Sequence, residues 1–96
     1  MATYITLMNF TDQGIRNVKE SPDRYEAFLG MAQKLGVTIK AVYWTVGQYD
    51  VVVIVEGAED AATSLLLKLG TLGNVRTQTL RGYSVEEIKQ IISKMP

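Results

Sequence analysis

The sequence contains no histidine and no cysteine among its 96 residues. Without cysteine no disulfide can form, so nothing indicates an oxidising compartment. Zinc and haem sites that use His or Cys ligands are excluded. Nucleophilic or general-base chemistry that depends on either residue is excluded as well. We therefore predict no metal site and no cofactor, and we assign no catalytic residue.

The chain also has no excess of either charge, few prolines and no long apolar run. Ten basic and ten acidic residues cancel to a net charge of zero, which argues against a nucleic-acid partner. The apolar run Val51 to Val55 is far shorter than the roughly 20 residues that span a bilayer, and the N-terminus does not resemble a secretory signal. We expect no membrane association and a cytoplasmic location. Only two prolines occur and no linker is visible, so residues 1–96 are predicted to form one domain.

Strand and helix patterns alternate along the chain. Segments rich in β-branched, aromatic and aliphatic residues predict strands over 3–10, 37–46, 51–56 and 74–80. Helical periodicity and start signals predict a short helix over 12–19 and longer helices over 22–35, 59–69 and from Val85 onward. The order βαββαβ with a C-terminal helix predicts an α+β, ferredoxin-like fold. Its four-stranded antiparallel sheet should carry the helices on one face.

Several residues mark the ends and contacts of these helices. Ser21, ahead of a proline, is expected to cap the first long helix, and Gly36 to end it in a left-handed conformation. Gly30 costs about 1 kcal/mol relative to alanine inside a helix, so we expect close packing there. Ser84 and Glu87 have the spacing of a capping box for the last helix.

The strand over 51–56 is apolar at each of its first five positions, and residues 42–46 are nearly so. A strand that is apolar on both sides is expected to be covered on both sides, and one helix layer covers only one. The C-terminal helix is one candidate for the second cover, and partial exposure of valine-rich strands is another alternative. A second subunit is the simpler cover, so we predict a homodimer with stacked sheets. A larger oligomer stays open because strand 37–46 can offer a free edge.

The run Tyr43-Trp44-Thr45-Val46-Gly47-Gln48-Tyr49-Asp50-Val51-Val52 resembles the signature of the GYD-domain family. Residues 4–7, 10–14 and 72–81 resemble that family too, so the likeness spans nearly the whole chain. It implies a dimeric α/β-barrel of ferredoxin-like fold and little about activity. A more distant likeness, at 47–50 and at 75–79, is to the effector-binding domain of leucine-responsive bacterial regulators. Those domains bind amino acids between subunits, but this chain lacks their DNA-binding helices.

We expect a small-molecule site near the turn between the second and third strands. The candidate ligand-binding residues are Tyr43, Trp44, Gly47, Tyr49, Asp50, Thr77 and Thr79. Most also have a structural alternative: a glycine turn with positive φ, an Asp that accepts backbone N–H groups within the turn, a Tyr49 that packs across the dimer seam, a core Trp, or threonines that simply favour strands. Tyr43 and Trp44 are neighbours on one strand and should face opposite sides. On the second face, Tyr43 could line a cleft with Tyr4 and Met8.

Three classes of function follow from these residues. A homo-oligomeric module that binds or senses a small molecule without catalysis is favoured. A structural or assembly partner is the first alternative. The second is a cofactor-independent oxygenase or isomerase of the dimeric α/β-barrel type, with Tyr43, Trp44 and Asn9 in a sheet cleft, and it rests on fold analogy alone.

Overall fold

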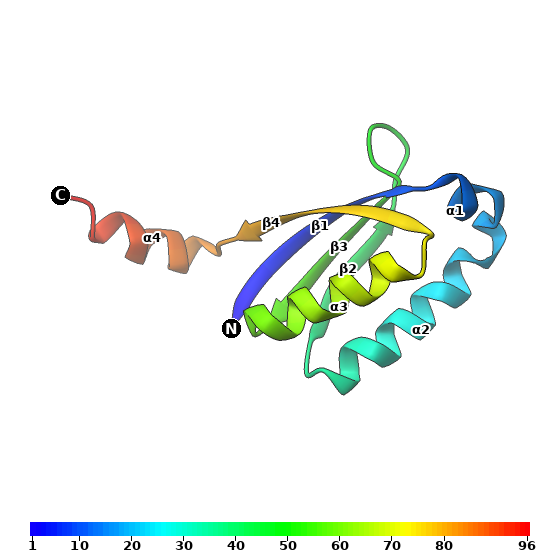
Figure 1. Cartoon of the computed structure of the whole chain (residues 1–96). Helices are drawn as coiled ribbons and strands as arrows, with labels where there is room; N and C mark the ends of the chain where they lie inside the picture. Colours follow the sequence, from blue (N-terminus) through cyan, green and yellow to red (C-terminus); the bar gives the residue numbers. More distant parts are fainter.

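A four-stranded antiparallel sheet carries two long helices on one of its faces (Figure 1). The computed structural model describes all 96 residues. The elements are β1 (Ala2–Phe10), α1 (Asp12–Arg16), the 3₁₀ turn η1 (Val18–Glu20), α2 (Ser21–Lys34), β2 (Thr38–Trp44), β3 (Val51–Gly57), α3 (Glu59–Thr71), β4 (Val75–Gly82) and α4 (Val85–Ser93). The strand order β2-β3-β1-β4 confirms the predicted ferredoxin-like α+β fold.

The strand register divides the sheet into a covered face and an open face. On the covered face, Val51, Val53 and Val55 of β3 and Thr6 and Met8 of β1 are buried beneath α2 and α3. The alternate residues point the other way, where no helix of the chain lies over them. We call that side the open face. Its apolar side chains are Ile5, Leu7, Ala41, Tyr43, Val52, Ile54 and Leu80.

Local signals predicted most boundaries, with two corrections at α2. The prediction that Ser21 caps α2 is wrong: Ser21 lies inside the helix, and its Oγ accepts a hydrogen bond from Nε1 of Trp44 at 2.9 Å. The prediction of close packing at Gly30 is also wrong, because a Cβ at this position would meet no atom within 4 Å. Gly36 does adopt the left-handed conformation, with φ of 72°.

The true close approach of backbone occurs at Gly14 in α1. A Cβ built there would lie 1.9 Å from the carbonyl oxygen of Asn74. Asn74 also accepts a hydrogen bond from the backbone N–H of Thr11 at 3.1 Å. The start of α1 is thus held directly against the chain that leads into β4, and only glycine fits there.

Helix α4 extends beyond the end of β4 and away from the rest of the protein (Figure 1). No other helix or strand packs extensively against it. The radius of gyration is 14.6 Å, compared with about 12.5 Å for a compact chain of this length. The alternative in which the C-terminal helix folds over the sheet's second face is therefore wrong.

The two glycines in helices α1 and α2 make a matched pair of test sites. We expect Gly14→Ala to lower the free energy of unfolding by about 1–3 kcal/mol, because the methyl group would force the backbone apart. We expect Gly30→Ala to raise it by about 0.5–1 kcal/mol through better helix propensity. Urea denaturation of both variants measures these changes. Equal effects of the two substitutions would contradict the close approach at Gly14.

Candidate functional site

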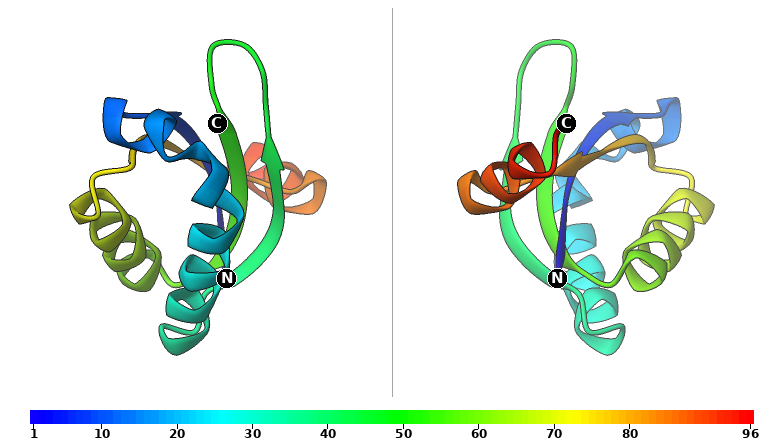
Figure 2. Two further views of the ribbon diagram at one scale, coloured as in Figure 1. Left: turned by 90° about the vertical axis from the view of Figure 1, so that its right-hand side faces the viewer. Right: turned by 90° about the vertical axis from the view of Figure 1, so that its left-hand side faces the viewer.

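The loop between β2 and β3 is a small hydrogen-bonded turn that protrudes beyond the strand ends (Figures 1 and 2). Across its neck, the N–H of Thr45 donates to the carbonyl of Asp50 at 2.8 Å, and the Thr45 hydroxyl donates to the carbonyl of Tyr49 at 2.6 Å. Gly47 has φ of 141°, a conformation that side chains other than hydrogen rarely allow. Val46 beside it is completely exposed. The turn therefore presents an apolar tip on a fixed backbone.

Asp50 fastens this turn to the end of β1. Its Oδ2 accepts a hydrogen bond from the N–H of Phe10 at 2.9 Å, and its own N–H donates to the carbonyl of Met8 at 2.8 Å. The carboxylate thus extends the β1–β3 pairing by one more contact. The structural alternative placed this carboxylate on backbone N–H groups within its own turn, whereas it binds the backbone of β1, outside the turn.

Two further contacts draw the turn toward the open face. Nδ2 of Asn9 donates to the carbonyl of Gln48 at 2.7 Å. The hydroxyl of Tyr49 donates to Oε1 of Gln78 at 3.0 Å. Asn9 and Gln78 lie on the open-face side of β1 and β4, so the turn bridges the strands at this end of the sheet.

Tyr43 and Trp44 face opposite sides of β2, as their adjacency predicts. Tyr43 lies on the open face and is 62% exposed. Trp44 lies on the helix side, where its ring meets that of Tyr25 edge to face, with centroids 6.0 Å apart. The prediction that Tyr43 shares a cleft with Tyr4 and Met8 is wrong, because the register turns both of those residues to the covered face.

A narrow apolar cavity of about 70 Å³ lies beside Trp44, between the two long helices and the sheet. Twelve of its fifteen lining residues are hydrophobic, among them Phe28, Met31 and Leu69. The polar groups at its border already have partners: Ser21 accepts from Trp44, and Nη1 of Arg24 donates to the carbonyl of Asn17 at 2.8 Å. The cavity can therefore accept a small apolar group without needing an ionic partner.

Thr77 and Thr79 lie on the covered face at the other edge of the sheet. They line a shallow groove of about 270 Å³ beneath α3, together with Tyr4, Ala62, Thr63, Leu66 and Leu67. The hydroxyl of Thr79 is also 3.2 Å from that of Thr6. These threonines are thus separated from the turn at residues 45–50 by the sheet itself.

The seven predicted ligand-binding residues fall into four places. Gly47, Tyr49 and Asp50 form the turn, Trp44 borders the apolar cavity, and Thr77 and Thr79 line the groove under α3. Tyr43 stands alone on the open face. Gln78 and Ser21, which hold Tyr49 and Trp44, were not among the predicted residues. Their partners are 29 and 23 positions away, so no local sequence signal identifies them.

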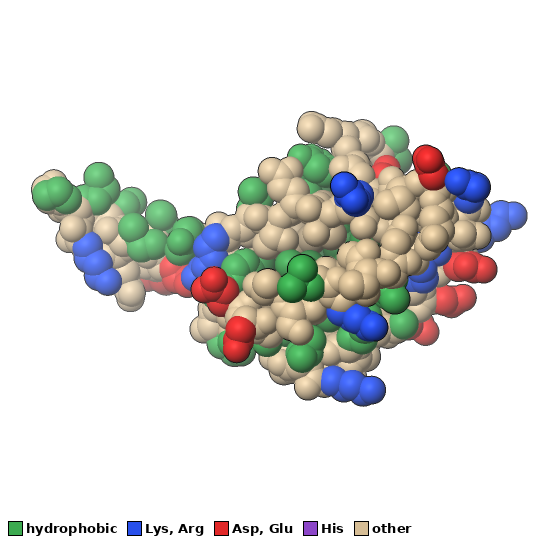
Figure 3. Space-filling model, viewed as in Figure 1, with side chains coloured by type: hydrophobic (Ala, Val, Ile, Leu, Met, Phe, Trp, Pro, Cys, Tyr) green, Lys and Arg blue, Asp and Glu red, His purple; other side chains and the backbone are tan.

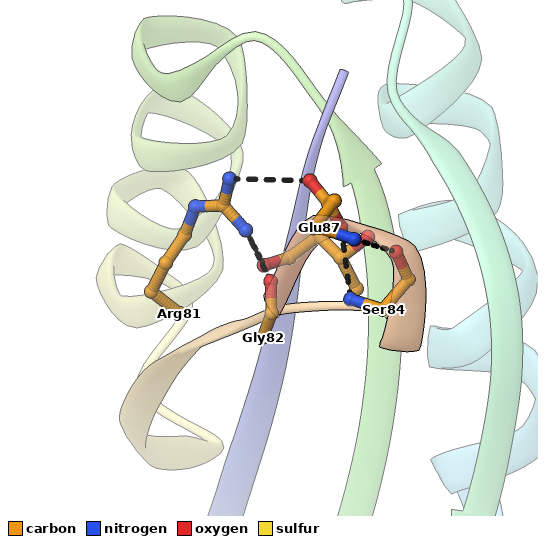
Figure 4. Close-up of polar contacts among 5 residues, drawn as sticks. Arg81, Gly82, Ser84 and Glu87 are labelled. Atoms are coloured by element: carbon orange, nitrogen blue, oxygen red, sulfur yellow. Dashed lines mark hydrogen bonds and ion pairs between the residues drawn. The ribbon is translucent and has the colours of Figure 1, made fainter. Parts of the chain in front are cut away.

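A second polar cluster surrounds the junction of β4 and α4 (Figure 4). The guanidinium of Arg81 donates to the carbonyls of Thr3 and Gly82, stacks over the ring of Tyr83 at 4.4 Å, and lies 3.9 Å from Oε2 of Glu87. Ser84 and Glu87 form the predicted capping box of α4. Hydrogen bonds from the backbone and the side chain of Ser84, with a smaller contribution from Arg81, lower the pKa of Glu87 from its ordinary value, because each contact favours the charged carboxylate.

No group of three Asp or Glu side chains is close enough together to hold a metal ion. None of the helices has the length and apolar character needed to cross a membrane.

Two solved structures have a similar fold. One is FFRP-DM1, with a TM-score of 0.59 and 22% identity, covering 86% of this chain and 100% of that one. The other is hypothetical protein PHS023 from Pyrococcus horikoshii, with a TM-score of 0.58 and 22% identity, covering 88% and 92%. At this level of identity the similarity concerns the fold alone.

Similarity in sequence goes further. A protein of Thermus thermophilus described as a glutamine synthetase and cystathionine beta-lyase binding protein is 37% identical over 91 residues, which cover 92% of this chain and 95% of that protein. The GYD domain matches residues 4–92, which include the turn, the open face and nearly all of α4. The chain belongs to the GYD domain family.

Proposed function

We propose that this chain is a homodimeric binding protein that docks on a metabolic enzyme and catalyses no reaction itself. The observation that carries the proposal is the open face, a set of apolar side chains on all four strands with no helix over them. An uncovered apolar surface of this extent marks a protein interface. A second copy of the chain is the simplest cover for it.

The size of the open face fits a sheet-to-sheet contact. Four strands with about seven paired residues each give a flat area of roughly 450 Å². Stacking two copies would bury roughly 900 Å² in total, somewhat less than the 1,200–2,000 Å² or so of stable interfaces. The contact would be mostly apolar, with Ile5, Leu7 and Ile54 near its centre.

The docking role is supported by the relative from Thermus thermophilus, whose name states that it binds glutamine synthetase and cystathionine β-lyase. We propose an enzyme of one of these two kinds as the partner of this chain. The turn at residues 45–50 supplies a suitable contact, because it protrudes past the strands and would stay outside the stacked sheets. A fixed turn with an apolar tip at Val46 loses little conformational entropy on binding.

The dimer is tested by placing a charge in the centre of the open face. We expect Leu7→Glu to give a monomer at concentrations where the native chain is a dimer, because stacking would bury an unpaired carboxylate. Sedimentation velocity measures the change, with Gln33→Glu on the exposed side of α2 as the control of equal charge. A native chain that sediments as a monomer would refute the sheet-stacked dimer.

Docking on an enzyme is tested with purified glutamine synthetase and cystathionine β-lyase from the organism that encodes this chain. We expect the native dimer to bind one of them, and Val46→Asp to weaken binding at least tenfold without changing the dimer. Biolayer interferometry measures the affinity, and Gln33→Glu again serves as control. If neither enzyme binds at tens of micromolar, the docking role is wrong, whereas equal binding by Val46→Asp would exclude only the turn as the contact.

Small-molecule binding is the second candidate, and the cavity beside Trp44 favours it. Its apolar lining and its size suit a short aliphatic or aromatic group. In this proposal Trp44 contacts the ligand directly. The other predicted ligand-binding residues lie on other surfaces and could contact the same ligand only if dimerisation brought them close to it: Tyr43, Gly47, Tyr49, Asp50, Thr77 and Thr79.

Trp44 is the only tryptophan of the chain, so its fluorescence reports on the cavity directly. A ligand in the cavity would change the surroundings of the Trp44 indole. We therefore expect small apolar probes, such as short aliphatic acids and alcohols, to shift the emission of Trp44 and to raise the melting temperature of the protein. Met31→Phe would shrink the cavity without adding a second tryptophan, and should abolish both effects while the protein stays folded. Unchanged emission with every probe would count against this site.

A further inference from the structure

We propose that α4 is an exchanged arm, which in the dimer packs its apolar side on the second copy. The inference rests on the homodimer proposed above and deepens it. The surface concerned is the apolar side of α4, which is not part of the stacked sheets. In the exchanged arrangement each copy gives one arm and receives one, as a two-fold axis requires.

The first argument is that α4 has an apolar side with nothing against it. Val85, Ile88, Ile91, Ile92 and Met95 are between 39% and 68% exposed, and no other element packs extensively on the helix. Hydrophobic side chains line the projecting helix in Figure 3. Its charged residues, such as Glu86 and Lys89, pair with each other instead, at 3.9 Å.

The second argument concerns the stability of the helix. A helix of nine residues is marginal in water on its own, because helices shorter than about 12–15 residues rarely persist without tertiary packing. The capping box at Ser84 and Glu87 satisfies backbone N–H groups of its first turn, but it leaves the apolar side of the helix exposed to water. A packing surface on another molecule would supply the tertiary contacts that stabilise a helix of this length.

The third argument is that the junction fixes the direction of α4. Arg81 holds the last residues of β4 through the carbonyl of Thr3 and holds the first turn of α4 through Glu87 (Figure 4). The linker consists of Tyr83 and Ser84 alone and spans at most about 7 Å. It cannot reverse α4 onto its own sheet while the contacts of Arg81 persist.

The fourth argument identifies the occupant as a second copy. In both views of Figure 2, α4 and α3 lie on opposite sides of the strands, so α4 is displaced toward the side of the open face. A copy stacked there therefore comes within reach of the arm. The stacked sheets alone bury roughly 900 Å² by the estimate above, less than the 1,200–2,000 Å² or so of stable interfaces, and two arms supply the missing area.

The experiment compares the two faces of α4. We expect Ile88→Lys with Ile92→Lys to raise the dimer dissociation constant at least tenfold, while Gln90→Lys on the same helix leaves it unchanged. Sedimentation equilibrium measures all three constants. A dimer of native affinity in the doubly substituted chain overturns the arm but leaves the stacked dimer standing. A native chain that is itself monomeric overturns both.

A second measurement locates the arm without weakening the dimer. Because the chain has no cysteine, Lys94→Cys can carry a single nitroxide label beside the apolar side of α4. Labelled chains are mixed with unlabelled ¹⁵N chains, so that only contacts between copies broaden the ¹⁵N signals. We expect broadening of partner amides at the margin of the open face, beyond the area that the stacked sheets cover. An intact mixed dimer without such broadening overturns the proposal.

Discussion

The constraint on which this structure depends is a sheet that is apolar on two faces and covered by helices on one. Val51, Val53 and Val55 of β3 are buried under α2 and α3, while Val52 and Ile54 on the same strand face away from every helix. Burial contributes about 25 cal/mol per Å² of apolar surface to the free energy of unfolding. In the isolated chain the apolar surface of the open face stays in water and makes no such contribution. The association proposed above would recover that contribution by burying the open face.

The course of the chain could be predicted because its signals are local. Alternating β-branched segments, the left-handed Gly36 and the spacing of Ser84 and Glu87 each act within a few residues. Ser21 and Gly30 show the limit of such reasoning. The hydroxyl of Ser21 in α2 binds Trp44 in β2, and a Cβ at Gly30 would meet no atom within 4 Å, so neither fact is visible from neighbouring residues. The close approach at Gly14 likewise depends on Asn74, which is distant in sequence.

The candidate site was harder to predict for a related reason. The sequence places Gly47, Tyr49 and Asp50 next to one another, and the structure keeps them in one turn. The sequence alone does not show on which face of the sheet a residue lies when both faces are apolar. Tyr43 and Trp44 were expected on opposite sides, but only the register assigns Trp44 to the helix side and Tyr43 to the open face. The same register separates Thr77 and Thr79 from the turn.

The two ends of the open face differ in a way that bears on how a partner can sit. At one end the turn is held down by Asn9, Gln78 and the backbone of Phe10. At the other end α4 is joined by a two-residue linker and oriented by Arg81. In the homodimer proposed above, a second copy would lie between a fixed turn at one end and an unpaired apolar helix at the other. The proposed interface would be bounded along the strand direction, which would limit slippage between the stacked sheets. A flat pair of apolar sheets alone would lack that limit, since apolar contact is non-directional.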